Sequence, residues 1–138
     1  MPGPLSGFKI IEMVGIGPAP FASMMLADMG AEVLRVDRVS GGGFLSGGGG
    51  PADVLGRNRK SAAINIKDER GVAAVLDLVE HADGFIEGLR PGVMERLGLG
   101  PDVCLARNPG LVYGRMTGWG QSGAYKDDVG HDINYCLL

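Results

Sequence analysis

The side chains of this chain best suited to chemistry are His131 and Asp132, which directly follow Gly130. An imidazole titrates near neutral pH, so it can take a proton from a substrate and pass it on. The pair opens a segment that predicts a helix, and the N–H groups of a first helical turn favour negative charge. His131 is therefore a candidate general base that makes an anion and keeps it stable. Asp132 points to another side of the helix and is expected to support the base.

The stretch before this pair predicts where the base lies. An apolar run, Leu111–Tyr113, leads into a glycine-rich segment, and a polar excursion then reaches Gly130. This pattern is typical of a buried strand that ends in a turn. Open α/β sheets bind their ligands just outside the carboxyl ends of the strands. We therefore expect the site at that edge of a sheet.

Apolar runs alternate with helical patterns along the chain. The alternation predicts an α/β fold, an open, mainly parallel, Rossmann-like sheet with flanking helices, formed as one domain over residues 1–138. Asp68 is the expected N-cap of one helix and Gly30 the expected stop of another. The strands are expected at 8–14, 32–36, 61–66, 84–87 and 111–116, and the helices at 21–29, 69–81, 92–97, 101–108 and from 131 onward.

The composition argues against several classes of function. A formal net charge of −3 gives no reason to expect nucleic acid as a partner, and no segment approaches the roughly 20 apolar residues of a membrane span. Cys104 and Cys136 have neither metal nor redox spacing, so we expect reduced thiols and no metal site. The N-terminus lacks a basic start followed by a long apolar core. These features predict a soluble, cytoplasmic protein.

Residues 40–56 form a glycine-rich loop, with eight glycines between Gly41 and Gly56. Glycine loses more conformational freedom on folding than any other residue, so such runs do not hold a regular element. The preferred interpretation is a mobile loop or insertion. The alternative is a flap that closes over a ligand.

Basic residues are concentrated between Arg35 and Lys67, where six of them stand against two acids. Such a cluster can be a solvated face of the protein. In an acidic chain it can also be a site for a phosphorylated small molecule, because phosphates need several cations or backbone donors at separated points.

The turn Gly15–Pro20 is close to a dinucleotide-binding fingerprint, with Asp37 about twenty residues further on. However, Pro20 stands where the third glycine would be, and Pro18 has no N–H to offer a phosphate. A tight strand-to-helix turn shaped by its prolines is the preferred interpretation, and NAD binding is the alternative.

Several motifs in order along the chain carry a resemblance to a known family. They are R-M-T-G-W-G-Q-S-G at 115–123, G-H-D-I-N-Y at 130–135, P-L-S-G at 4–7, G-I-G-P-A-P at 15–20, V-L-R-V-D-R at 33–38, R-N-R-K at 57–60 and E-G-L-R-P-G-V-M-E-R-L at 87–97. With these motifs the chain resembles the α-methylacyl-CoA racemases, within the family III CoA transferases, over essentially its whole length.

The resemblance implies an acyl-CoA substrate, with coenzyme A as part of that substrate and no permanently bound cofactor. It implies that His131 is the base, and that a second acid, an aspartate downstream of the G-H-D motif, lies beyond Leu138. It also implies an intertwined homodimer. The implied CoA contacts are Arg38, Ile64, Asn65, Ile66, Lys67, Gly88, Leu89, Arg90, Arg96, Gly130 and Tyr135.

This chain departs from the family pattern at Val39, where a proline is common, and at Asn65, where an aspartate is common. Two alternatives to a racemase stay open. One is a CoA transferase that uses a carboxylate nucleophile, and the other is a non-catalytic CoA-binding fragment. The apolar run Tyr135–Leu138 carries no helix-stop signal. We therefore expect the chain to be the N-terminal part of a longer protein.

Overall fold

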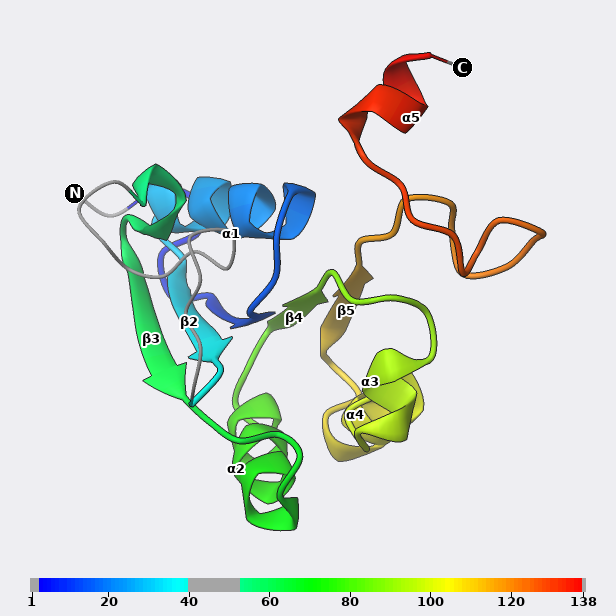
Figure 1. Ribbon diagram of the computed structural model, residues 1–138. Coiled ribbons are helices and arrows are strands. Elements are labelled where there is room, and N and C mark those ends of the chain that lie inside the picture. The colour runs from blue at the N-terminus through cyan, green and yellow to red at the C-terminus, as the bar shows by residue number, and fades with distance from the viewer. Residues whose placement is uncertain (1–2, 40–52, 138) are drawn as a thin grey trace.

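The computed structural model describes residues 3–39 and 53–137, which form a single five-stranded sheet (Figure 1). All four strand pairs are parallel, and the strand order is β3-β2-β1-β4-β5. The chain thus leaves β1 in one direction to form β2 and β3, and then returns to the other side of β1 to form β4 and β5. The predicted fold class, an open parallel α/β sheet with flanking helices, is confirmed.

The elements follow the predicted order with small differences at their ends. The strands are β1 Lys9–Met13, β2 Glu32–Asp37, β3 Arg59–Ala63, β4 Gly84–Glu87 and β5 Val112–Arg115. The helices are α1 Pro18–Asp28, α2 Glu69–Val79, α3 Val93–Arg96, α4 Pro101–Arg107 and α5 Asp132–Cys136, with a short 3₁₀ helix η2 at Val54–Gly56. As predicted, Asp68 is the N-cap of α2, and its carboxylate accepts the Arg70 N–H at 2.9 Å.

Helix α1 begins three residues earlier than predicted, at Pro18. The reason is local. Gly17 takes a left-handed φ of 76° as the N-cap, and a proline in the first turn lacks an N–H that would have no helical partner there. The helix ends as predicted, because Gly30 with φ 100° closes its last turn.

Strand β3 is the element that the sequence placed wrongly. It was expected at 61–66, but it spans Arg59–Ala63, so Ile64 and Ile66 lie in the loop that follows. The error came from starting the strand after two charged residues. Arg59 and Lys60 are strand residues because each faces a carboxylate, that of Glu12 and that of Glu32 respectively.

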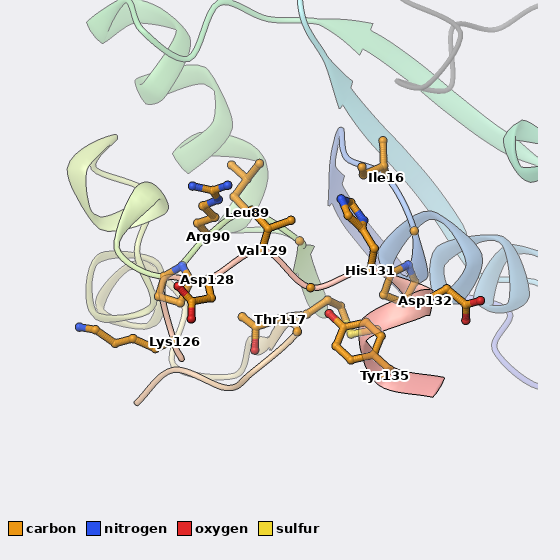
Figure 2. A pocket seen from close by; sticks show the side chains of 17 residues that line it. Ile16, Leu89, Arg90, Thr117, Lys126, Asp128, Val129, His131, Asp132 and Tyr135 are labelled. Atoms are coloured by element: carbon orange, nitrogen blue, oxygen red, sulfur yellow. The ribbon is translucent and has the colours of Figure 1, made fainter. Parts of the chain in front are cut away.

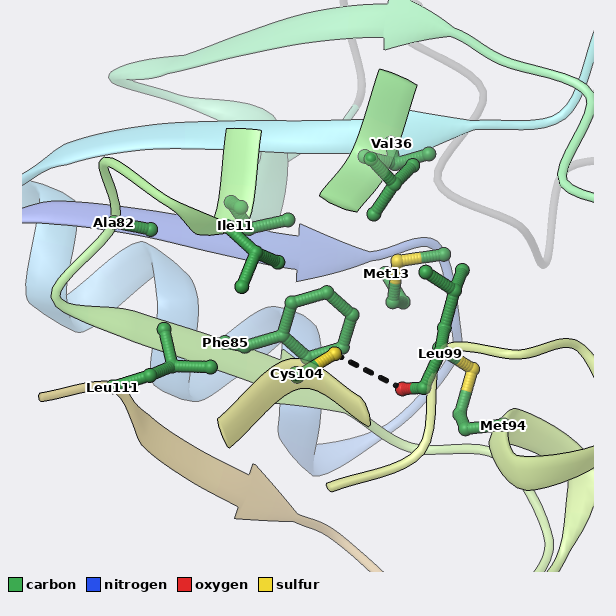
Figure 3. Close-up of a cluster of buried hydrophobic side chains, with 11 residues drawn as sticks. Ile11, Met13, Val36, Ala82, Phe85, Met94, Leu99, Cys104 and Leu111 are labelled. Carbon is green, nitrogen blue, oxygen red and sulfur yellow. Dashed lines mark hydrogen bonds between the residues drawn. The ribbon is translucent and has the colours of Figure 1, made fainter. Parts of the chain in front are cut away.

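The apolar core lies on the face of the sheet that α2, α3 and α4 cover (Figures 1 and 3). Phe85 of β4 is at its centre and stacks on Tyr113 with 4.9 Å between ring centroids. Each fully buried side chain of this size contributes roughly 1.5–3 kcal/mol. Cys104 is part of this core: its thiol donates to the Leu99 carbonyl at 3.4 Å, and burial raises its pKa to about 11.

The opposite face of the sheet, under α1, contains buried charges. The guanidinium of Arg59 and the carboxylate of Glu12 form an ion pair in which the side chains are 2% and 0% exposed. Beside them, Arg35 donates to Asp37 at 2.8 Å and to Asp53 at 3.4 Å. A buried pair tolerates the loss of hydration only while both partners are present. This face therefore combines matched buried charges with a smaller apolar cluster around Ala27, Ala31 and Val33.

The glycine-rich loop lies mostly outside the described residues, which resume at Asp53. Asp53 accepts the Gly56 N–H at 3.0 Å and so caps η2. Among the helices of the described segments, none combines the length and apolar character that a bilayer crossing requires.

Candidate active site

A cleft of about 770 Å³ lies at the carboxyl edge of the sheet, where the loops after β1, β4 and β5 meet (Figure 2). β1 and β4 are neighbours, and the chain turns in opposite directions on their two sides. Such a switch point leaves a crevice, because the loops on its two sides diverge. The sequence predicted the site at this edge, and this cleft lies there.

One side of the cleft is formed by the turns that leave the sheet, which we call the sheet wall: Ile16–Pro18 after β1, Gly88–Pro91 after β4 and Met116 after β5. A Cβ added at Gly88 would lie 3.2 Å from the Cβ of Ala19, a tighter contact than is usual, so glycine lets the β4 turn lie this close to α1 without a shift. The Met116 N–H donates to the Glu87 carbonyl at 2.9 Å and ties the β5 turn to the β4 turn. This wall is an extension of the buried sheet.

The other side of the cleft, which we call the outer wall, is formed by Lys126, Asp128–Asp132 and Tyr135. In Figure 1 this segment leaves the end of β5 and runs away from the layers of the sheet. All its residues are exposed except Gly130, which is half-buried. The outer wall therefore rests on a few local contacts.

His131 lines the cleft as the N-cap of α5, and Figure 2 shows its imidazole beside Ile16 of the sheet wall. The side-chain oxygen of Asn134 accepts the His131 N–H at 3.0 Å, and the His131 carbonyl accepts the Asn134 N–H at 2.9 Å. These two bonds fix the backbone that carries the imidazole. The helix begins one residue later than predicted, so His131 lies just before its first turn. α5 has only five residues, so its dipole is small.

Asp132 also lines the cleft, but its carboxylate points away from the imidazole (Figure 2). One carboxylate oxygen accepts the thiol of Cys136 at 3.4 Å, one turn further along α5. Asp132 therefore supports the helix that carries His131 and does not orient the ring by direct contact.

The Tyr135 hydroxyl of the outer wall lies close to two glycines, Gly118 and Gly130. A Cβ at Gly118 or Gly130 would overlap the Tyr135 hydroxyl, so a side chain at either position would displace the Tyr135 ring. The ring of Trp119 packs on Tyr135 with 5.2 Å between centroids and on Tyr125 with 5.9 Å. Trp119 is thus a packing anchor for the outer wall, and it does not line the main cleft.

Seven of the predicted site residues are brought together in this cleft: Gly88, Leu89, Arg90, Gly130, His131, Asp132 and Tyr135. The other predicted contacts lie elsewhere. Arg38 follows β2 and residues 64–67 follow β3, at the same edge of the sheet but on the far side of β1. Arg96 lies on α3 beside the cleft, with its guanidinium close to Gly92. A ligand that reached from the β3 loop to the β5 loop would cross four strand spacings, roughly 19 Å.

The basic segment divides into two groups. Arg35, Arg57, Arg59 and Lys60 are each paired with a carboxylate of this chain, so they do not form the free cationic cluster that the sequence suggested. Within residues 3–39 and 53–137, Arg38, Lys67 and Arg90 form no ion pair.

The structure argues against NAD binding, because the acidic residue that would bind the ribose is already engaged. Asp37 accepts from the Arg35 guanidinium at 2.8 Å and also from the Ser61 hydroxyl, so its carboxylate is engaged inside the sheet. A ribose hydroxyl would have to displace one of these donors. With Pro18 and Pro20 in α1, the first turn of this fold offers neither the N–H groups nor the acid that NAD needs.

Sequence reasoning missed Ile16, Lys126 and Asp128, which line the cleft, and Glu87, which lies beneath it. The sequence could have indicated Ile16, because it stands between two glycines in the predicted strand-to-helix turn. Lys126 and Asp128 are surface residues of an irregular segment, and only the path of the chain brings them to the cleft. In the sequence, Glu87 is only the last residue of a predicted strand, and nothing there indicates a role for its carboxylate.

Comparisons with known proteins agree on one family. The profile of CoA-transferase family III matches residues 5–137. Among curated proteins, the chain is 43% identical over 136 residues to α-methylacyl-CoA racemase of Homo sapiens, and 42% identical over 134 residues to that of Mus musculus. Each match covers 97% of this chain and 33% of the relative. Human succinyl-CoA:glutarate CoA-transferase is 37% identical over 138 residues, which cover 94% of this chain and 31% of that protein. The chain therefore spans about a third of the length of these relatives.

Solved structures agree with the fold. The Rv3272 protein of Mycobacterium tuberculosis superposes with a TM-score of 0.87 at 34% identity, over 98% of this chain and 39% of that one. A CAIB/BAIF family protein of Brucella suis superposes with a TM-score of 0.83 at 30% identity, over 96% of this chain and 38% of that one.

Proposed function

This chain belongs to CoA-transferase family III, and on that premise we propose that the protein containing it is an α-methylacyl-CoA racemase-like enzyme. It would invert the configuration of 2-methylacyl-CoA thioesters by removing the α-proton and returning one on the opposite face. The observation that carries this proposal is the position of His131. This residue is exposed and lines the same cleft as the β4 turn that the resemblance assigns to CoA.

The binding half of the proposal uses the sheet edge. The thioester end of the substrate would lie in the cleft against Gly88, Leu89 and Arg90, with Tyr135 and Gly130 on the other side. The phosphates and adenine would extend toward Arg38 and the loop 64–67. Arg38 and Lys67 suit this role, because both are exposed and form no ion pair in the described part of the chain. Coenzyme A is then part of the substrate, and no other cofactor is invoked.

The chemical half follows from the basicity of the imidazole. A ring nitrogen of His131 takes the proton from C2, and the electron pair of the C–H bond moves into the enolate of the thioester. Donors at the carbonyl oxygen stabilise the charge that develops there. Inversion then needs a second group that gives a proton to the other face of the planar enolate. The resemblance assigns that group to an aspartate in the part of the relatives beyond the matched third.

A CoA transferase is the second candidate, because succinyl-CoA:glutarate CoA-transferase matches the same residues at 37% identity. Transferase chemistry uses a carboxylate that attacks the thioester and forms an anhydride. It has no need of a base for an α-proton at the position of His131, which is why we place the racemase first. For the longer protein we further propose an intertwined homodimer, on the resemblance alone, and a cytoplasmic location, on the sequence features alone.

The test is exchange of the α-hydrogen of a 2-methylacyl-CoA with solvent deuterium, measured on the full protein that contains this chain. His131→Ala should slow exchange by at least about 10². His81→Ala is the matched control, because His81 is an exposed histidine at the end of α2, far from the cleft. Exchange at the wild-type rate in His131→Ala would remove this histidine from the mechanism. Transfer of CoA to a free carboxylic acid without α-exchange would establish the transferase instead.

A further inference from the structure

Glu87 is a buried carboxylate directly beneath the cleft, and the proposed mechanism does not use it. It is the last residue of β4 and is 1% exposed. It does not line the cleft itself, but the next four residues, Gly88–Pro91, do. Its side chain leaves the sheet on the face of the apolar core, on the same side as Phe85, two residues earlier.

Each oxygen of this carboxylate has a partner. One accepts the Leu89 N–H at 2.7 Å, and the other faces the Arg115 guanidinium at 3.4 Å. Glu87 and Arg115 are also register partners on neighbouring parallel strands. Arg115 in turn reaches Glu95 on α3, so two carboxylates share one guanidinium. Burial raises the pKa of Glu87 in spite of the Leu89 and Arg115 donors.

The bond to Leu89 determines the shape of the β4 turn. Because the carboxylate takes the Leu89 N–H, that N–H is not available to a ligand, and the chain has to fold back over the end of its own strand. The Leu89 side chain packs against the apolar core, while the side chain of Arg90 is exposed and lines the cleft. The neighbouring Gly88 is held against Ala19 of α1. The turn is thus held at two consecutive residues, Gly88 and Leu89.

We propose that Glu87 is a positioning residue for substrate binding. It holds the turn Gly88–Arg90 in the shape that accepts CoA and, through Arg115 and the Glu87 carbonyl, keeps the β4 and β5 turns in register across the cleft. It does not touch the substrate. This inference rests on the proposed function, because only that function makes CoA the ligand of the β4 turn.

Two conservative substitutions separate the bond to Leu89 from the charge. Glu87→Gln keeps an oxygen that can accept the Leu89 N–H but loses the negative charge beside Arg115. Glu87→Asp keeps the charge but withdraws the carboxylate by one methylene, so that it no longer reaches Leu89. If the role is positioning, Glu87→Gln binds CoA within about 3-fold of wild type and Glu87→Asp binds roughly 3- to 10-fold more weakly, the value of one hydrogen bond.

The measurements are calorimetric affinity for coenzyme A and the kinetics of α-hydrogen exchange, on the full protein. We expect Glu87→Asp to raise KM with kcat changed less than about 2-fold, because only ground-state positioning is lost. Hydrogen exchange of the Leu89 amide should become faster in Glu87→Asp and stay slow in Glu87→Gln. Glu80→Gln is the control, since this exposed carboxylate pairs with Arg107 away from the cleft.

The opposite order of affinities, with Glu87→Gln weaker than Glu87→Asp, would overturn the proposal and leave Glu87 as an ion-pair partner of Arg115. Equal, wild-type affinity in both variants, with a faster Leu89 amide in Glu87→Asp, would overturn it as well. A wild-type protein that does not bind coenzyme A would overturn the proposed function and this inference together, so the two failures are distinguishable.

Discussion

The two walls of the cleft are built on different physical principles. The sheet wall consists of short turns whose neighbours are buried: Ala19 under Gly88, Glu87 under Leu89, and the Glu12–Arg59 pair under the end of β1. The outer wall consists of exposed residues, held by the wedge of Tyr135 between two glycines and by the bonds between His131 and Asn134. The proposed base thus lies on the wall with fewer constraints, and most of the proposed CoA contacts lie at the sheet edge.

This difference has a general consequence for mutations. Changes under the sheet wall should act mainly on the free energy of unfolding, because they leave buried groups without partners. Changes in the outer wall should act mainly on binding and turnover, because an exposed segment can move without unfolding the sheet. The predictions that follow test this division, in order of decreasing effect.

The largest effect is expected from Arg59→Met, which breaks the buried ion pair beneath the sheet wall. It leaves the Glu12 carboxylate buried without its cation and should lower the free energy of unfolding by about 3–5 kcal/mol. Urea unfolding measures this directly. The double variant Glu12→Leu with Arg59→Met replaces both charges by apolar groups and should recover most of the loss. A double variant as unstable as the single one would mean that the pair is not the source of the cost.

A smaller effect is expected on ligand affinity from the exposed cations. If Arg38 and Arg90 contact phosphates, removing either charge by substitution with alanine should weaken coenzyme A by about 1–3 kcal/mol, and the wild-type dissociation constant should rise with salt. Arg107→Ala is the control, since this arginine pairs with Asp77 and Glu80 on α2. Calorimetric affinities unchanged in both variants would reduce Arg38 and Arg90 to solvated surface charges.

Gly118→Ala tests the outer wall. The added methyl group would overlap the Tyr135 hydroxyl and displace the ring, which should weaken CoA binding about 10-fold and hardly change the melting temperature. In a Tyr135→Phe background the overlapping atom is absent, so the same substitution should have little further effect. Gly15→Ala is the control, because its nearest neighbour, the Met13 carbonyl, would be 3.8 Å away. A large loss of thermal stability in Gly118→Ala would contradict the division between the walls.

The smallest effect concerns pH and lies at the surface. Hydrogen bonds from the Arg57 and Asn58 side chains lower the pKa of Asp28 below its ordinary value of 3.8. A carboxyl with a lowered folded pKa stabilises the protein above its unfolded pKa and loses that contribution as the pH falls through the folded pKa. Asp28→Asn should therefore lower stability slightly at neutral pH, and the difference from wild type should shrink as the pH falls below about 4 and vanish once the pH is below the folded pKa of Asp28. A difference that persisted at pH 2 would show that charge is not its cause.

Several features of the fold and site followed from local patterns in the sequence. Glycine and proline marked the turns at Gly17–Pro18 and Gly30, because few other residues adopt those backbone angles. Apolar periodicity located the strands and helices. It missed the start of α1 by three residues, and it misplaced β3, where Arg59 and Lys60 are strand residues that face distant carboxylates. The cleft at the carboxyl edge followed from the parallel order of the strands.

The partners of the charged side chains could not be predicted in this way. Arg38 and Arg59 look alike in the sequence, yet one is exposed and the other is buried against a carboxylate 47 residues away. Glu87 gave no local signal in the sequence. The role of its carboxylate depends on the Leu89 N–H, which folds back over it, and on Arg115, which lies on the adjacent strand.

The sequence by itself determined the order of the elements, the sharp turns and the candidate base, since these depend on backbone angles and periodicities within a few residues. Only the tertiary structure decided which cations remain free for a ligand, which carboxylates are buried, and which residues of the exposed segment face the sheet. The physical reason is that an ion pair or a cleft forms between residues that are far apart in the sequence. Its formation depends on how close these residues lie in space and on how deeply they are buried, and a local sequence pattern contains neither.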